Sequence, residues 1–124
     1  MELTIQILVG LVTLMLLGLG LMSMFAPNKM LANFSVEPIG ISGLNTIRSV
    51  IGGLFLASVA ILVISQMTGQ TMGYLAVAIL MAAIAVGRVV GLVMDGFEKA
   101  VVPPLLLELV IASILVAAHS QLIS

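Results

Sequence analysis

Three ionisable side chains, Arg48, Arg88 and Glu108, stand inside long hydrophobic runs of the sequence. An arginine, lysine or aspartate at the centre of a membrane helix costs about 2.5 to 3.5 kcal/mol on insertion scales, so such residues usually face a protein interior and neutralise one another. A guanidinium can bind an anionic group, and a carboxylate can carry a proton. No nucleophile–base set, phosphate-binding loop or metal-ligand cluster appears in the sequence. We therefore expect no enzyme activity, cofactor or metal.

The spacing of these charges predicts that they lie at one depth. Arg48 is roughly 9 Å into its hydrophobic run, and Arg88 is about 10 Å from the end of its own, at 1.5 Å per residue. Glu108 reaches a similar depth if the proline pair before it occupies the first turn of a helix. Asp95 follows Arg88 on the same helical face, because residues seven apart share a face. We expect Arg48, Arg88, Asp95 and Glu108 to form one buried cluster without net charge.

Three interpretations of this cluster remain open. It is an architectural ion-pair network that fixes helix register, a site whose arginines bind an anionic lipid headgroup or another amphiphile, or a proton or ion pathway through Glu108. A membrane enzyme that acts on lipid is a further alternative, but the sequence offers it no nucleophile–base pair.

The composition sets the class of protein that carries these charges. Of the 124 residues, 62% are hydrophobic and 7% are charged, whereas a soluble domain has roughly 25% charged residues. This excludes a soluble enzyme and a disordered chain. The 4 Lys+Arg residues cannot build a phosphate-neutralising face, so we expect no nucleic-acid partner. With 0 Cys, disulfides and thiolate metal sites are also excluded.

Four hydrophobic runs are each long enough to cross a bilayer, which takes about 20 helical residues. Backbone groups in hydrocarbon must be satisfied within the segment, and no alternating strand pattern occurs, so the runs are helices. The first is longer than the core of a signal peptide and lacks a basic start, which favours a permanent span. We predict an all-α integral membrane four-helix bundle, residues 1–124 as one domain, with spans at about 3–25, 43–67, 72–94 and 103–122.

The connections predict the orientation. The connection at residues 65–73 is short and uncharged, whereas the one at residues 26–42 is longer and carries Lys29. The longer connection forms either a short interfacial helix, with Met30, Leu31 and Phe34 on one face, or an irregular loop. Lys29 and Lys99 fall in the two connections on the same side, which the positive-inside rule places in the cytoplasm. We therefore expect a multi-pass protein of a bacterial inner (cytoplasmic) membrane with both termini outside.

Several glycines are expected to allow close helix packing, which in lipid depends on small residues. These are Gly52 and Gly53 in the second run and the Gly87–Gly91 pair in the third. The pair serves either packing within the chain or self-association. His119 has no partner within its own helical turn and is interpreted as an interfacial residue rather than a metal ligand.

The sequence resembles a bacterial membrane family catalogued as domain of unknown function 4345. The resemblance extends from about Phe25 to Ala118. It rests on Arg48-x-x-x-Gly52-Gly53, on Gly87-Arg88-x-x-Gly91-x-x-x-Asp95-Gly96, and on Glu108 in a leucine-rich run. It implies a compact four-helix membrane bundle, distantly like DoxX-type proteins, and implies no established activity.

From these observations we expect a non-enzymatic membrane protein. Its charged cluster would bind a lipid or amphiphile, or it would support a membrane complex as an accessory protein. The expected partners are membrane lipids, a second copy of the chain or another membrane protein. The alternative is a small oligomeric proton-coupled transporter or channel that uses Glu108.

Overall fold

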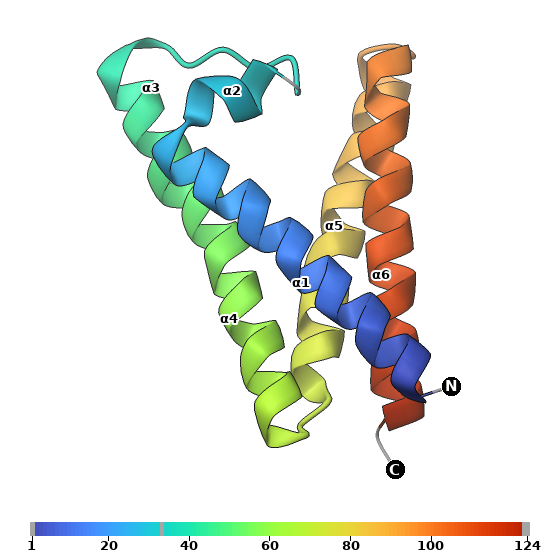
Figure 1. Ribbon diagram of the computed structural model, residues 1–124. Coiled ribbons are helices and arrows are strands. Elements are labelled where there is room, and N and C mark those ends of the chain that lie inside the picture. Colours follow the sequence, from blue (N-terminus) through green and yellow to red (C-terminus); the bar gives the residue numbers. More distant parts are fainter. Residues whose placement is uncertain (1, 33, 123–124) are drawn as a thin grey trace. The chain divides into compact units, whose positions relative to one another are not determined.

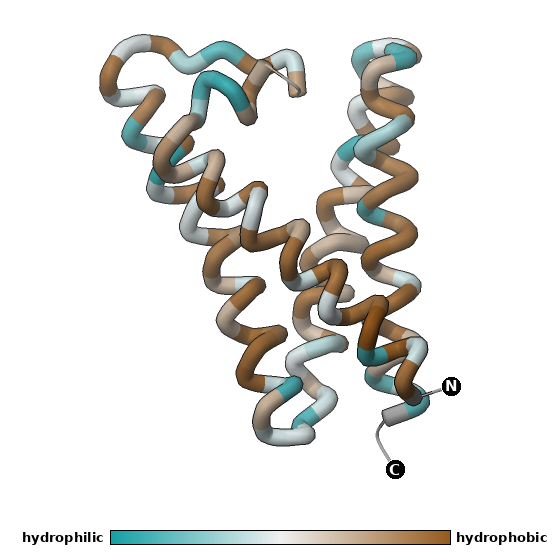
Figure 2. The backbone as a smooth tube through the Cα atoms, viewed as in Figure 1, coloured by the Kyte–Doolittle hydropathy of each residue, from teal (hydrophilic) through white to brown (hydrophobic). Residues whose placement is uncertain are grey.

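The computed structural model describes residues 2–32 and 34–122, and the described chain is helical with no strand. Four helices are long and apolar enough to cross a membrane: Leu3–Phe25, Gly40–Thr68, Met72–Met94 and Lys99–Gln121. The all-α membrane fold class predicted from hydropathy is therefore confirmed. Figure 2 shows hydrophobic residues over most of the four long helices, with hydrophilic ones mainly in the connections.

The helices follow the chain in a simple order (Figure 1). The first half contains α1 (Glu2–Phe25), the short α2 (Pro27–Ala32), α3 (Gly40–Thr46), a π-helical turn (Ile47–Ile51) and α4 (Gly52–Thr68). The second half contains α5 (Met72–Met94), a 3₁₀ turn (Lys99–Val101) and α6 (Val102–Leu122). The second long helix thus begins at Gly40, three residues before the sequence predicted. The φ of Gly40 is 66°, a left-handed conformation that glycine adopts without strain.

The chain divides into two compact units, which are described separately below. Unit 1 comprises the described residues of Met1–Gly10 and Ile64–Ser124, and unit 2 is Leu11–Val63. The single domain expected from the sequence stays a prediction.

In unit 1, α5 and α6 pack side by side (Figure 1). Each helix buries residues spaced three or four apart, which form one face. The buried residues are Tyr74, Val77, Ala78, Met81 and Ala85 in α5, and Ile111, Leu115 and Ala118 in α6. These buried residues lie mostly in the first half of α5 and in the second half of α6.

In unit 2, glycines permit a close approach between α1 and α4. A Cβ atom on Gly20 would lie 2.8 Å from Leu56 Cδ2, and one on Gly52 would lie 3.3 Å from the backbone nitrogen of Met24. Gly20 and Met24 are one turn apart on α1, and Gly52 and Leu56 are one turn apart on α4. Gly20 therefore faces the side chain of Leu56, and Gly52 faces the backbone and Cβ of Met24.

The short helix α2 was expected at the membrane interface if it formed. It does form, over Pro27–Ala32, but Met30 and Leu31 are each only 3% exposed. Phe34 lies beyond the helix in a turn and is half-buried. The apolar residues of α2 therefore pack against protein.

Candidate functional site

Arg88 and Glu108 form an ion pair between α5 and α6. The Nε–H of Arg88 donates to both carboxylate oxygens of Glu108, at 2.7 Å to Oε1 and 2.9 Å to Oε2. The two side chains are 26% and 13% exposed. The spacing places Arg88 one turn beyond Ala85, and Glu108 one turn before Ile111, so both continue the buried faces of their helices. This pair extends the apolar contact between the helices with an electrostatic one.

Asp95, the fourth member of the expected cluster, lies at the end of α5. Its backbone N–H donates to the carbonyl of Gly91 at 2.8 Å, and its side chain is exposed. Gly96 follows with a φ of 106°, a left-handed conformation that glycine adopts without strain. Asp95 therefore ends the helix, and the structure gives it no ion pair with Arg88 among the described residues.

Arg48 belongs to unit 2 and lies in the π-helical turn. Its Nη1 donates to the carbonyl oxygen of Met24, in the last turn of α1. The carbonyls of a last helical turn lack partners within their helix, and a cation there is favoured by the helix dipole. The structure thus brings two members of the predicted cluster together, Arg88 and Glu108, whereas the cluster of all four stays a prediction.

The other end of α6 carries a polar contact that the sequence did not predict. The Nδ1 of His119 lies 3.2 Å from the carbonyl oxygen of Thr71 and 3.0 Å from its hydroxyl. The carbonyl can only accept a hydrogen bond from Nδ1, whereas the hydroxyl can either donate to Nδ1 or accept from it. The partner precedes α5 and is 48 residues away along the chain. No spacing rule within one helix could find it.

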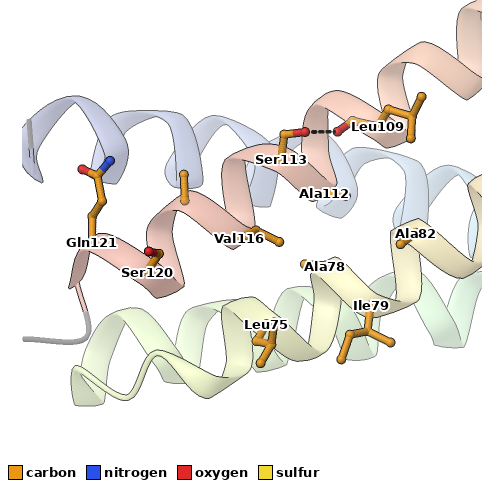
Figure 3. A pocket seen from close by; sticks show the side chains of 11 residues that line it. Leu75, Ala78, Ile79, Ala82, Leu109, Ala112, Ser113, Val116, Ser120 and Gln121 are labelled. Atoms are coloured by element: carbon orange, nitrogen blue, oxygen red, sulfur yellow. Dashed lines mark hydrogen bonds between the residues drawn. The ribbon is translucent and has the colours of Figure 1, made fainter.

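An open groove of about 630 Å³ runs along the flank of the contact between α5 and α6 (Figure 3). Alanines and large apolar side chains make most of its wall. The lining residues are Leu75, Ala78, Ile79 and Ala82 from α5, with Leu109, Ala112, Ser113, Val116, Ala117, Ser120 and Gln121 from α6. Ile79, Leu109 and Val116 are 62%, 46% and 48% exposed, so they form its outer edges.

Polarity is distributed unevenly along this groove. Ser120 and Gln121 lie together at one end of it, and Leu109 lies toward the other (Figure 3). Ser113 lies between them, but its hydroxyl donates to the carbonyl of Leu109 at 2.8 Å within the same helix. The groove can therefore receive an apolar chain whose polar end is near Gln121.

The glycines predicted to pack helices differ in their surroundings. Gly52 approaches α1 closely, as described above. A Cβ atom on Gly53 or Gly87 would meet nothing within 4 Å, and one on Gly91 would meet only Asp95 of its own helix, at 3.9 Å. No described neighbour of Gly87 therefore requires a glycine, and self-association through the Gly87–Gly91 pair stays a prediction.

Among the described residues, no group of three or more His, Cys, Asp or Glu side chains could hold a metal ion.

Comparison with known proteins gives one family. The model of a family described as "Domain of unknown function (DUF4345)" matches residues 4–119. No curated protein and no solved structure matches the chain.

Proposed function

We propose that this chain, which belongs to the DUF4345 family, is a non-enzymatic multi-pass membrane protein that holds a lipid or similar amphiphile between α5 and α6. The observation that carries the proposal is the groove of about 630 Å³, with an apolar wall and its polar residues at one end. An amphiphile likewise consists of an apolar tail and a polar end. Its tail would lie along Leu75, Ile79 and Leu109, and its polar end would lie near Ser120 and Gln121.

The groove occupies a place in the membrane that suits such a ligand. Gln121 is the last residue of the candidate span Lys99–Gln121, so it lies near a membrane boundary. Leu109 lies about 18 Å from it along the helix, at 1.5 Å per residue. A lipid whose headgroup is at the boundary would therefore place its tail in the groove without moving a polar group into hydrocarbon.

The ion pair supports a structural role beside this groove. Glu108 precedes the groove residue Leu109, and its carboxylate is neutralised by Arg88 at 2.7 Å. A neutralised guanidinium attracts an anionic headgroup less than a free one does. We therefore assign the Arg88–Glu108 pair to fixing the two helices that form the groove.

The test is native mass spectrometry of the detergent-purified protein. Ala112→Phe and Ala82→Phe place a ring in the groove, and most of the co-purifying lipid should be lost from both variants. Ala83→Phe is the matched control, because Ala83 is exposed on the same helix and does not line the groove. Lipid occupancy that is equal in all four proteins would refute the proposal.

The same experiment distinguishes an accessory or scaffold role. Grooves lined by small residues also receive a second transmembrane helix, because the backbones can approach closely. If the groove-filling variants lose a second protein copy or a co-purifying protein, and their lipid stays bound, the groove is a helix-docking site and the lipid proposal fails.

A further inference from the structure

The helix from Gly40 to Thr68 is longer than a bilayer core. Its 29 residues measure about 43 Å at 1.5 Å per residue, whereas the hydrocarbon is about 30 Å thick and the bilayer with its headgroups about 40–45 Å. To fit entirely within the hydrocarbon, the helix would have to tilt by more than about 40° from the bilayer normal, which is the upper limit seen in structures. Residues 50–68 alone measure about 28 Å and are mostly apolar. Residues 40–49 therefore lie at the depth of the headgroups.

The first ten residues of this helix carry a polar face. Ser42, Asn45, Thr46 and Ser49 are spaced three and four apart, and all four are exposed. The hydroxyls of Thr46 and Ser49 donate to the carbonyls of Ser42 and Asn45, at 3.1 and 2.8 Å. The protons of these two hydroxyls are therefore used within the helix, and the hydroxyl of Ser42 and the amide of Asn45 are the side-chain donors that this face presents outward.

Arg48 lies beside Asn45, since residues three apart on a helix are neighbours. Its side chain is exposed. One nitrogen, Nη1, donates to the carbonyl of Met24, which holds the guanidinium near the last turn of α1. A guanidinium has five N–H groups, so this contact leaves donors that can bind a second acceptor.

The positive charge of Arg48 has no carboxylate partner among the described residues. Lys29, Glu37 and Arg48 are the charged residues of unit 2, which sum to a charge of +1. Glu37 is the one carboxylate of the unit, and no salt bridge joins it to Arg48. Arg48 therefore differs from Arg88, whose charge is met by Glu108.

Gly52 explains how Arg48 reaches α1. It follows Arg48 by one turn, and a Cβ atom there would lie 3.3 to 3.5 Å from the nitrogen, Cβ and Cα of Met24. This close approach brings the π-helical turn against the end of α1. The guanidinium is therefore positioned by the backbone of two helices before any ligand binds.

We infer that Arg48 and Asn45 bind the phosphate group of an anionic phospholipid. Arginine is suited to phosphate because its planar fork donates two parallel hydrogen bonds. The net positive charge of the unit favours a ligand of net negative charge, and the headgroup depth of residues 40–49 favours a lipid over free phosphate. This site is in unit 2 and the α5–α6 groove is in unit 1, so the two proposals can fail independently of one another.

The full chain in detergent is titrated with phosphatidylglycerol and, separately, phosphatidylcholine, and bound lipid is counted by native mass spectrometry. Wild type should prefer phosphatidylglycerol. Arg48→Gln, whose amide can still donate to Met24, should bind phosphatidylglycerol about tenfold more weakly or worse, because hydrogen bonds to charged groups are the stronger class. Lys99→Gln, which removes an exposed cation of unit 1, is the matched control and should bind as wild type does.

Equal affinity of wild type and Arg48→Gln for phosphatidylglycerol overturns the inference, and so does an equal loss in Lys99→Gln. Displacement of the lipid by inorganic phosphate overturns the assignment to a lipid. If Arg48→Gln does not fold, Asn45→Ala replaces it, since its side chain is exposed and makes no described hydrogen bond. That variant should bind about threefold more weakly, the loss of one ordinary hydrogen bond, and unchanged binding would overturn the inference.

Discussion

Glu108 and His119 lie on the same face of α6, three helical turns apart. Each makes a polar contact outside its own helix: Glu108 with Arg88 of α5, and His119 with Thr71, directly before α5. Ile111, Leu115 and Ala118 are buried between them, each no more than 2% exposed. The apolar face of α6 therefore ends in a polar contact on both sides, and these contacts fix how α6 slides and rotates against α5.

Replacing one member of the Arg88–Glu108 pair should destabilise unit 1. Arg88→Gln or Glu108→Gln leaves a partly buried charge without its partner. Full burial would cost about 3–5 kcal/mol, and because the side chains are 26% and 13% exposed we expect about 1–3 kcal/mol. The chain has 0 Trp, so unfolding is best followed by circular dichroism in detergent.

The exchange Arg88→Glu with Glu108→Arg provides the control for that prediction. It restores opposite charges at the same two positions, so it should be more stable than either single reversal. A double variant no more stable than the worse single variant would show that the pair contributes no specific interaction.

The contact between His119 and Thr71 should contribute less. His119→Ala and Thr71→Ala each remove a hydrogen-bonding side chain, for an expected loss of about 0.5–1.5 kcal/mol. The hydroxyl contact at 3.0 Å predicts that the double variant loses less than the sum of the singles, whereas the backbone carbonyl of Thr71 persists in all of them. Strictly additive losses in a double-mutant cycle would mean that the two side chains are not coupled.

The packing of α1 on α4 predicts a sharp difference among glycines. Gly20→Ala places a methyl group 2.8 Å from Leu56, so Leu56 must move, and we expect a loss of about 1–3 kcal/mol. Gly53→Ala is the matched control, because its methyl group would meet nothing within 4 Å and alanine favours a helix. Gly20→Ala should unfold at a lower temperature than Gly53→Ala, and adding Leu56→Ala should relieve the clash in the Gly20→Ala variant. Equal stability of both variants would contradict the close approach.

Hydropathy alone was sufficient for the four long helices, since a run of about 20 apolar residues has few other uses. It could not set the start of the second one at Gly40, because Gly40 and Ser42 resemble the connection that precedes the span. The approach of Gly20 to Leu56 also escaped prediction. A glycine is compatible with many packing arrangements, and only the structure shows which of them faces a large side chain.

Residue depth predicted that Arg88 and Glu108 could meet, because both positions are counted from helix ends that meet in one connection. Asp95 shares a helical face with Arg88, but it lies at the very end of α5, where its side chain is exposed. The partners of Arg48 and His119 were missed for another reason. Both are bound to backbone carbonyls, of Met24 and Thr71, and a backbone acceptor has no signature in a sequence.

A proton-coupled transporter that uses Glu108 makes a different prediction from the lipid proposal. Such a carboxylate must gain and lose a proton in each cycle, so it would have to leave the Nε–H of Arg88, which contacts both of its oxygens. The ion pair would therefore have to open before Glu108 could take part in proton transfer. We therefore expect proteoliposomes with wild type and with Glu108→Gln to show the same pH-gradient-driven proton flux, measured with an internal pH dye and compared with empty vesicles. Flux that is above the empty-vesicle level in wild type and abolished in Glu108→Gln would favour transport, and an Arg88→Gln variant with faster flux would show that the ion pair limits it.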